Sequence, residues 1–228
     1  MFTGLVEELG VVRRMERRRG AQRWRVECSW RDLVLGESIA VHGACLTVAE
    51  IVAGGFEADL STETLARTSL GGRAVGDRVH LERATPLGGR MGGHMVLGHV
   101  DGVGAVASSQ RGDDGTMALE LRAPGELARF IAAKGSIAVD GVSLTVNTVI
   151  DEGREATRFS IMLVPHTLQR TTLGDLAANQ TVNLEVDVLA RYVQRQFEVE
   201  RGGNASEGAG GSDADANLYA KLRSGGFA

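Results

Sequence analysis

The hydrophobic positions of the chain fall mainly in short, valine-rich runs that are separated by glycine-rich turns. Residues 39–41, 46–51 and 78–81 are examples. Runs of this length, rich in β-branched residues and bounded by turn residues, are typical of β-strands. Apolar and polar positions alternate only loosely, which favours strands that are partly buried on both faces. The pattern therefore predicts an all-β fold with short strands.

Two segments have helical spacing instead. Residues 124–134 open with a proline and an acidic first turn, which predicts a short helix between strands. Residues 188–200 predict a C-terminal α-helix with one apolar face, formed by Leu189, Tyr192, Val193 and Phe197. This face must pack either on the chain's own strands or on the same helix of other chains, and the pattern favours neither. Residues 201–228 are rich in glycine and polar residues and predict a flexible tail.

An internal repeat organises the strands. Residues 1–12 recur at 95–106, residues 38–48 recur at 136–146, and residues 64–71 recur at 167–174. Two long repeats indicate a duplicated domain, whereas a solenoid needs several shorter units. We therefore expect two small β-barrels, at residues 1–97 and 98–187, followed by the helix at 188–200 and the tail at 201–228.

Composition excludes several classes of protein. The net charge of −4 does not indicate a nucleic-acid partner. The basic cluster at residues 13–19 has no interleaved aromatic residues and is interpreted as a solvated hairpin tip. Cys28 and Cys45 suggest neither a disulfide framework nor a metal motif, which fits a reducing compartment. No segment resembles a signal peptide or a membrane span, so we expect a soluble, cytoplasmic protein.

The two copies differ in chemistry at three equivalent pairs: Leu5 and His99, Cys45 and Ser143, and Ala84 and Asp187. The second copy thus carries an imidazole, a hydroxyl and a carboxylate, which are groups that serve proton transfer and nucleophilic addition. Each has a structural alternative; Asp187, for example, would cap the helix that follows it. Together they predict a polar site in the second copy and a more apolar one in the first. A metal site is not predicted, because His94 and His99 lack further ligands at metal spacing.

Several long motifs resemble the riboflavin synthase family. They are MFTGLV at residues 1–6, GACLTV at 43–48, GGHMVLGHV at 92–100, KGSIAVDGVSLTV at 134–146 and TLQRTTLG at 167–174. The resemblance extends from residue 1 to about residue 197. It implies two tandem six-stranded Greek-key β-barrels with a C-terminal helix. It also implies a homotrimer, joined through these helices, whose active sites lie between the first barrel of one subunit and the second barrel of another.

The resemblance implies an activity as well. Riboflavin synthases convert two molecules of 6,7-dimethyl-8-ribityllumazine into riboflavin and 5-amino-6-ribitylamino-2,4(1H,3H)-pyrimidinedione. A four-carbon unit moves from one molecule to the other, in the last step of riboflavin biosynthesis, and no metal or organic cofactor is needed. An association with lumazine synthase is left open by the sequence.

The residues expected to bind substrate follow from the same resemblance. In the first barrel they are Gly4, Leu5, Val6, Cys45, Leu46, Thr47, Asp59, Leu60, Ser61, Thr62, Glu63 and Thr64. In the second they are Gly98, His99, Val100, Ser143, Leu144, Thr145, Leu163, Val164, Pro165, His166, Thr167 and Leu168. Lys134 is expected to reach across from a neighbouring chain.

Four residues are candidates for the chemistry: Cys45, His99, Ser143 and Asp187. Our hypothesis is that Ser143 and Asp187, with His99 nearby, handle the nucleophile and the protons in the second barrel. The first barrel, with Cys45, then mainly binds the partner molecule.

Two other functions are considered. A non-catalytic relative would bind lumazine or flavin with an intact first barrel and a degraded second one. Here residues 134–146 and 167–174 keep the family motifs, which favours an enzyme. A barrel adaptor that binds anions through residues 13–19 leaves the repeated motifs unexplained.

Overall fold

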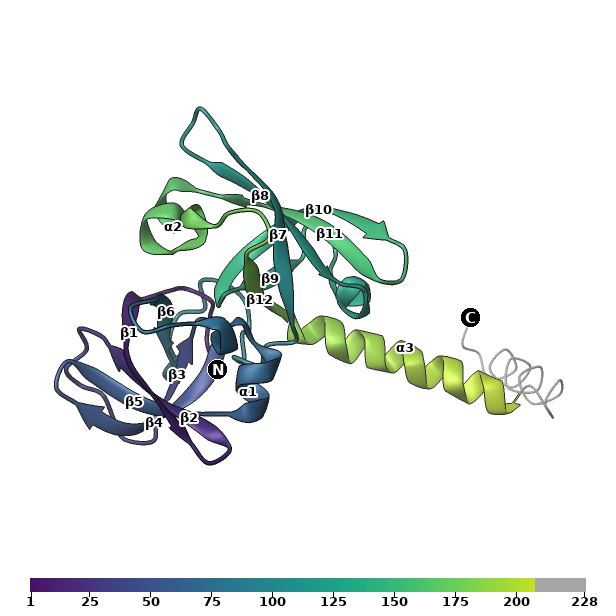
Figure 1. Cartoon of the computed structure of the whole chain (residues 1–228). Helices are drawn as coiled ribbons and strands as arrows, with labels where there is room; N and C mark the ends of the chain where they lie inside the picture. Colours follow the sequence, from purple (N-terminus) through teal and green to yellow (C-terminus); the bar gives the residue numbers. More distant parts are fainter. Residues whose placement is uncertain (208–228) are drawn as a thin grey trace. The chain divides into compact units, whose positions relative to one another are not determined.

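The structure, a computed structural model, describes the backbone of residues 1–207 and the side chains of residues 1–200. Two closed, six-stranded antiparallel barrels form its main part (Figure 1). The first contains β1 (Glu8–Arg18), β2 (Ala21–Glu27), β3 (Ser38–Val41), β4 (Ala44–Val52), β5 (Gly55–Ser61) and β6 (Arg78–Arg83). The second contains β7 (Gly102–Arg111), β8 (Met117–Pro124), β9 (Ser136–Val139), β10 (Val142–Glu152), β11 (Ala156–Leu163) and β12 (Thr181–Val186).

The two barrels share one topology. Around the first barrel the strands follow the order β1-β2-β5-β4-β3-β6, and the second barrel repeats this order with β7 to β12. Because β3, β4 and β5 form a meander and β2 lies beside β5, each barrel contains a Greek key. The predicted duplication and the all-β fold class are therefore confirmed.

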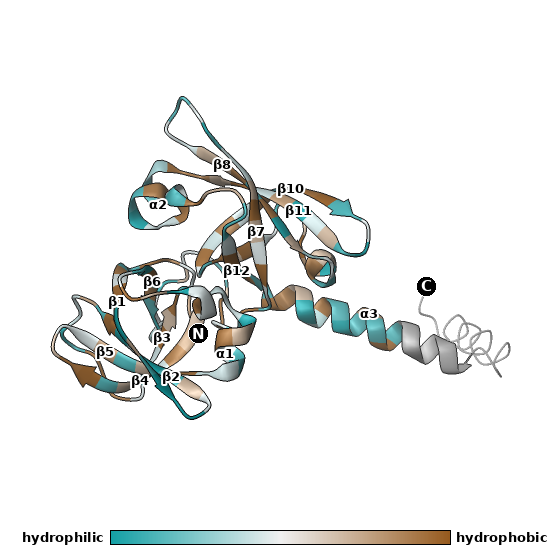
Figure 2. Cartoon of the chain, in the orientation of Figure 1, coloured by the Kyte–Doolittle hydropathy of each residue, from teal (hydrophilic) through white to brown (hydrophobic). Residues whose placement is uncertain are grey.

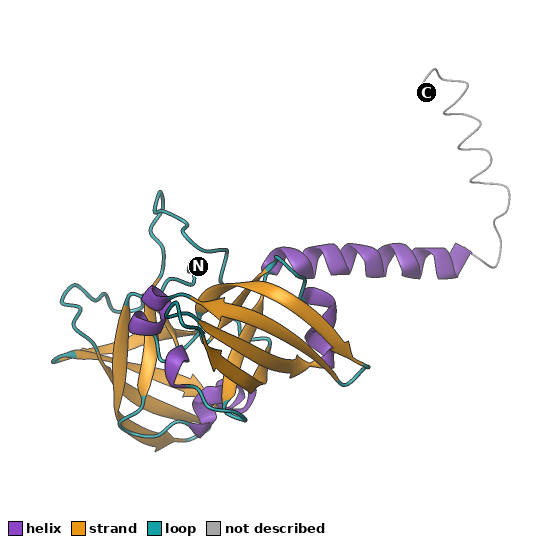
Figure 3. Cartoon of the chain, turned by 90° about the horizontal axis from the view of Figure 1, so that it is seen from above, coloured by secondary structure: helices purple, strands orange, loops and turns teal. Residues whose placement is uncertain are grey.

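Helical elements are short within the barrel region (Figure 3). They are α1 (Thr62–Arg67), η1 (Ser69–Gly72), η2 (Gly125–Phe130), α2 (Pro165–Arg170) and η3 (Leu173–Asp175). The helix expected at residues 124–134 is only the short 3-10 helix η2, because residues 131–135 form a turn that leads into β9. No helix among the described residues has the length and apolarity required to cross a bilayer.

The C-terminal helix α3 (Val188–Glu207) is present and is longer than the predicted 188–200. It continues through Gly202 and Gly203, where the sequence predicts a flexible tail. Glycine disfavours a helix by about 1 kcal/mol relative to alanine but does not forbid the helical backbone. The rest of the expected tail, residues 208–228, lies outside the described residues.

Each barrel encloses its own hydrophobic core. In β8, Met117, Leu119, Leu121 and Ala123 are buried in alternation with less buried neighbours, as one face of a strand requires. The first core is built around Trp24, Phe56, Leu60 and Leu81, which are fully buried. Figure 2 shows the resulting change between hydrophobic and hydrophilic residues along the strands.

The barrels meet at an interface that is built twice, once from each copy. Phe2 and Val96 form an isolated antiparallel bridge and pack with Ala40 and Ala138. The turns that follow β3 and β9 touch through their glycines: a Cβ on Gly43 would lie 2.7 Å from the backbone nitrogen of Gly141. Since both glycines have positive φ, 88° and 81°, the close approach depends on residues without side chains.

Equivalent polar side chains cross this interface in opposite directions. His80, on β6, lies with Nδ1 2.8 Å from the carbonyl oxygen of Asp140, and its Nε2 accepts from the Thr172 backbone N–H. Asn183, the counterpart of His80 on β12, donates to the carbonyl oxygen of His42. Its side-chain oxygen accepts from the backbone N–H of Ser69, which is the counterpart of Thr172. The interface therefore has an approximate twofold arrangement.

The interface should make folding sensitive to acid through His80. Its contacts fit the neutral ring, in which Nδ1–H donates and Nε2 accepts, and burial lowers the pKa of His80 to about 3. In the unfolded chain histidine titrates near 6.5. Between these values the unfolded state binds a proton that the folded state does not, so stability falls as the pH falls.

His80→Asn tests this effect, because asparagine occupies the equivalent position, 183, in the second copy. In denaturant titrations, we expect His80 to lower the free energy of unfolding by about 1.4 kcal/mol for each pH unit below pH 6. The variant should lack that part of the slope. Identical slopes for the two proteins between pH 6 and pH 4 would contradict this assignment.

Candidate active site

The segments that begin the two copies are exchanged between the barrels. Residues 4–6, which precede β1, lie against β10 of the second barrel, while residues 98–100, which precede β7, lie against β4 of the first. Val6 accordingly packs on the second hydrophobic core and Val100 on the first. The expected grouping, in which each segment serves its own barrel, is wrong.

The first site is a pocket of about 360 Å³ beside the start of β4. Its lining consists of Ala44, Cys45, Ser61, Glu63, Thr64, Arg67, Thr68, Gly98, His99 and Val100. The Cys45 backbone N–H donates to the carbonyl oxygen of Gly98 at 2.9 Å. Ser61 caps α1 by accepting from the Thr64 N–H, which fixes the helix that carries Glu63 and Thr64 at the pocket edge.

The second site repeats this construction at the start of β10. The Ser143 backbone N–H donates to the carbonyl oxygen of Gly4 at 2.8 Å, as Cys45 does to Gly98. A Cβ on Gly4 would lie 2.5 Å from the Cβ of Ser143, so this position requires glycine. Ser143 Oγ lies 2.7 Å from Nδ1 of His94, a residue of the linker between the barrels.

Two buried glutamates hold the exchanged segments in place. The Glu82 carboxylate accepts from the backbone N–H groups of Thr3 and Gly4, at 2.6 and 2.9 Å. Glu185, its counterpart, accepts from those of Leu97 and Gly98, at 2.6 and 3.0 Å. Burial raises the pKa of each carboxyl group, and the backbone donors partly oppose this. Each carboxylate thus positions one segment of the opposite site.

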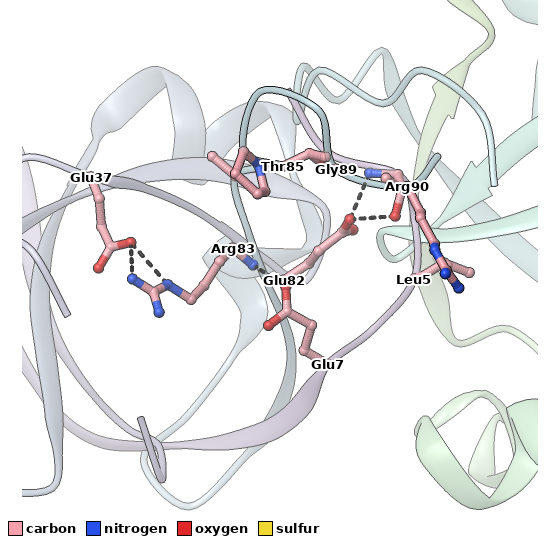
Figure 4. Close-up of a pocket in the computed structure, with 11 residues that line it drawn as sticks. Leu5, Glu7, Glu37, Glu82, Arg83, Thr85, Gly89 and Arg90 are labelled. Carbon is pink, nitrogen blue, oxygen red and sulfur yellow. Dashed lines mark hydrogen bonds and ion pairs between the residues drawn. The ribbon is translucent and has the colours of Figure 1, made fainter. Parts of the chain in front are cut away.

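A larger cavity, of about 600 Å³, is lined by residues of the N-terminal segment and of the stretch that follows β6 (Figure 4). It is lined by Leu5, Glu7, Glu82 and Arg90, among others. Arg83 and Glu37 also line this cavity and form an ion pair at 2.9 Å. Leu5 therefore faces this cavity, whereas its counterpart His99 faces the pocket that contains Cys45.

The remaining residues expected to bind substrate are divided between core and surface. Leu46, Leu60, Leu144 and Leu163 are buried in the barrel cores, so their side chains serve mainly to shape the walls. Asp59 is exposed and pairs with Arg23. The others are exposed or half-buried: Thr47, Thr62, Thr145, Val164, Pro165, His166, Thr167 and Leu168. Lys134 is exposed in a turn with φ of 66°.

The structure corrects the predicted partners of Ser143. His99 belongs to the pocket of Cys45, and the imidazole that contacts Ser143 is that of His94. Asp187 accepts from the Leu189 backbone N–H, which confirms its helix-capping alternative, and it also acts electrostatically on His94. The sequence interpretation missed His94, Arg67, Glu82 and Glu185. Both glutamates and Arg67 lie in segments that recur in the two copies, which was the available signal.

Two closed Greek-key barrels, one with a pocket of about 360 Å³ beside β4 and the other with the same backbone contacts at the start of β10, are the architecture of a duplicated small-molecule-binding protein. Residues 3–84 and 97–187 both match the lumazine binding domain. The chain belongs to this family.

Its curated relatives include riboflavin synthases. The protein of Mycobacterium bovis is 44% identical over 198 residues, which cover 86% of this chain and 97% of that protein. The protein of Photobacterium phosphoreum is 41% identical, and the alignment covers 88% of this chain and 91% of that protein. The protein of Bacillus subtilis is 36% identical, and the alignment covers 86% of this chain and 89% of that protein.

Among solved structures, the fold resembles LumP. The crystal structure of LumP complexed with 6,7-dimethyl-8-(1'-D-ribityl) lumazine has a TM-score of 0.72 and 23% identity, with 82% of this chain and 99% of LumP aligned. The complex of LumP with riboflavin gives a TM-score of 0.73 at 24% identity, with the same coverage. At this identity the likeness concerns the fold.

Proposed function

We propose that this protein is a riboflavin synthase. It converts two molecules of 6,7-dimethyl-8-ribityllumazine into riboflavin and 5-amino-6-ribitylamino-2,4(1H,3H)-pyrimidinedione by transfer of a four-carbon unit. The observation that carries this proposal is the retention of two complete lumazine binding domains in a chain 36% to 44% identical to riboflavin synthases. No cofactor is part of the proposed reaction.

The two sites suit the two different roles that the substrate molecules must play. One lumazine loses a proton from its 7-methyl group, and the other accepts a nucleophile at C7. The first site offers the Cys45 thiol and the His99 imidazole, while the second offers the Ser143 hydroxyl with His94. Holding the two rings in a fixed orientation contributes several kcal/mol to such a reaction. We assign nucleophile and proton handling to the second site.

Assembly and location complete the proposal. The protein is a homotrimer joined through α3, whose Leu189, Tyr192, Val193 and Phe197 are exposed apolar residues. Its active sites lie between subunits, and Lys134 reaches across from a neighbouring chain. A cytoplasmic location agrees with the two free thiols of Cys28 and Cys45. An association with lumazine synthase stays a prediction.

Incubation of the purified protein with 6,7-dimethyl-8-ribityllumazine tests the function. Riboflavin should accumulate at half the rate at which lumazine disappears, together with the pyrimidinedione. Tight binding of lumazine without any product would instead identify a non-catalytic lumazine-binding protein.

Ser143→Ala and Asp187→Ala should separate binding from turnover. We expect each to lower kcat by about 100-fold or more, the usual contribution of a positioned proton-transfer group or nucleophile. The dissociation constant of lumazine, measured by fluorescence titration, should change by less than about threefold. Equal losses of binding and turnover would count against this assignment of roles.

A further inference from the structure

The contact between His94 and Ser143 is built into the interior of the protein. His94 is 8% exposed, and its backbone N–H donates to the carbonyl oxygen of Thr3 at 3.2 Å. Its Nδ1 lies 2.7 Å from Ser143 Oγ, and its buried Nε2 has no hydrogen-bond partner among the described residues. A buried polar atom without a partner costs about 1–3 kcal/mol, so its retention calls for a functional reason.

Ser143 has little freedom to turn away from His94. Its side chain lies between the backbones of Gly4 and Gly93: a Cβ on Gly4 would be 2.5 Å from the Ser143 Cβ, and one on Gly93 would be 2.8 Å from Ser143 Oγ. The bond from the Ser143 N–H to Gly4 fixes the backbone as well. The hydroxyl is thus held in position before any substrate binds, as an efficient nucleophile requires.

The electrostatic surroundings fit a base that accepts the hydroxyl proton. When Nδ1 accepts from Ser143 Oγ–H, the neutral ring carries its proton on Nε2. Burial lowers the pKa of His94 and favours this neutral form, while the charge of Asp187 acts in the opposite direction and stabilises the imidazolium once it forms. The two residues that hydrogen-bond with His94 among the described residues, Thr3 and Ser143, are uncharged.

The first site lacks this arrangement. Cys45 occupies the position of Ser143 and is held by Gly98 in the same way. His99 lines the same pocket, but no hydrogen bond joins it to Cys45 in the part of the chain that the structure describes. His94 comes from the linker that only the first copy has after its last strand, so the duplication does not repeat it.

We propose that His94 is the general base for Ser143, an inference that rests on the proposed riboflavin synthase function. The Oγ–H bond of Ser143 breaks and its proton moves to Nδ1 of His94. Oγ forms a bond to C7 of the lumazine at the second site, and the electron pair of the C7 double bond moves into the pyrimidinedione ring. Departure of Oγ reverses the transfer, so no other reactant is consumed.

His94→Asn is the direct test, because the asparagine amide can still hydrogen-bond Ser143 but cannot act as a base. We expect a fall in kcat of about 100-fold with lumazine affinity unchanged within about twofold. The fall of kcat at low pH, caused by protonation of the base, should disappear. The double variant with Ser143→Ala should be no slower than Ser143→Ala alone. His99→Asn is the matched comparison, and its kcat should still fall at low pH.

Other outcomes would contradict the role of His94 as the base. If kcat of His94→Asn still falls at low pH, His94 is a structural residue and not the base. The same holds if the double variant loses kcat by the product of the two single losses. If His94→Asn does not fold, His94→Ala with added imidazole replaces it. Recovery that follows the concentration of neutral imidazole supports the proposal, and absence of recovery contradicts it. A wild-type protein that forms no riboflavin would overturn the proposed function itself, whatever the variants do.

Discussion

Replacing Gly43 by alanine is expected to lower the free energy of unfolding of the two-barrel unit by about 3 kcal/mol or more. The new Cβ would lie 2.7 Å from the backbone nitrogen of Gly141, in an interface with no flexible side chain that could move aside. The positive φ of 88° adds strain for any residue with a side chain. Strain and overpacking each cost about 1–3 kcal/mol.

Gly36→Ala is the control for this prediction. Gly36 has a similar φ of 84°, but a Cβ there would meet nothing within 4 Å. Chemical denaturation should therefore show a smaller loss, from backbone strain alone. Gly141→Ala should resemble Gly43→Ala, because its Cβ would lie 2.8 Å from the Gly43 nitrogen. If Gly36→Ala and Gly43→Ala were equally destabilising, the close approach of the two turns would not be the cause.

Glu82→Gln and Glu185→Gln should each weaken one binding site, and in each case the site of the opposite barrel. Each of the two carboxylate oxygens accepts from one backbone N–H, so an amide places a donor where one of these oxygens accepts, and an unsatisfied buried donor costs about 1–3 kcal/mol. Glu82→Gln should release residues 3–6 from Ser143. Glu185→Gln should release residues 97–100 from Cys45. We expect at least a tenfold loss of riboflavin affinity at the affected site.

Two measurements check this pair. Calorimetric titration with riboflavin should show one weakened site per chain in each variant and two in the double variant. Amide hydrogen exchange should become faster in residues 3–6 for Glu82→Gln and in residues 97–100 for Glu185→Gln. Faster exchange in the opposite segment, or equal weakening of both sites by each variant, would show that the carboxylates do not act separately.

The sequence alone determined the duplication, the fold class and the principal chemical differences between the copies. These features depend on local patterns: short valine-rich runs, turn glycines, and blocks that recur in the same order. The pairs Cys45/Ser143 and Leu5/His99 were recognisable because equivalent positions in a repeat can be compared directly. The helix α3 was predicted from its period, but its end was not, because the glycines at 202 and 203 weaken a helix without ending it.

Only the tertiary structure decided which segment serves which barrel. Residues 4–6 and 98–100 begin equivalent copies and meet equivalent strands, so the sequence is compatible with either pairing. The choice depends on long-range contacts, namely the Phe2–Val96 bridge, the paired glycine turns and the two glutamates. The exchange places His99 beside Cys45, and the linker brings His94 to Ser143. Such contacts join residues far apart in the chain, and no local pattern records them.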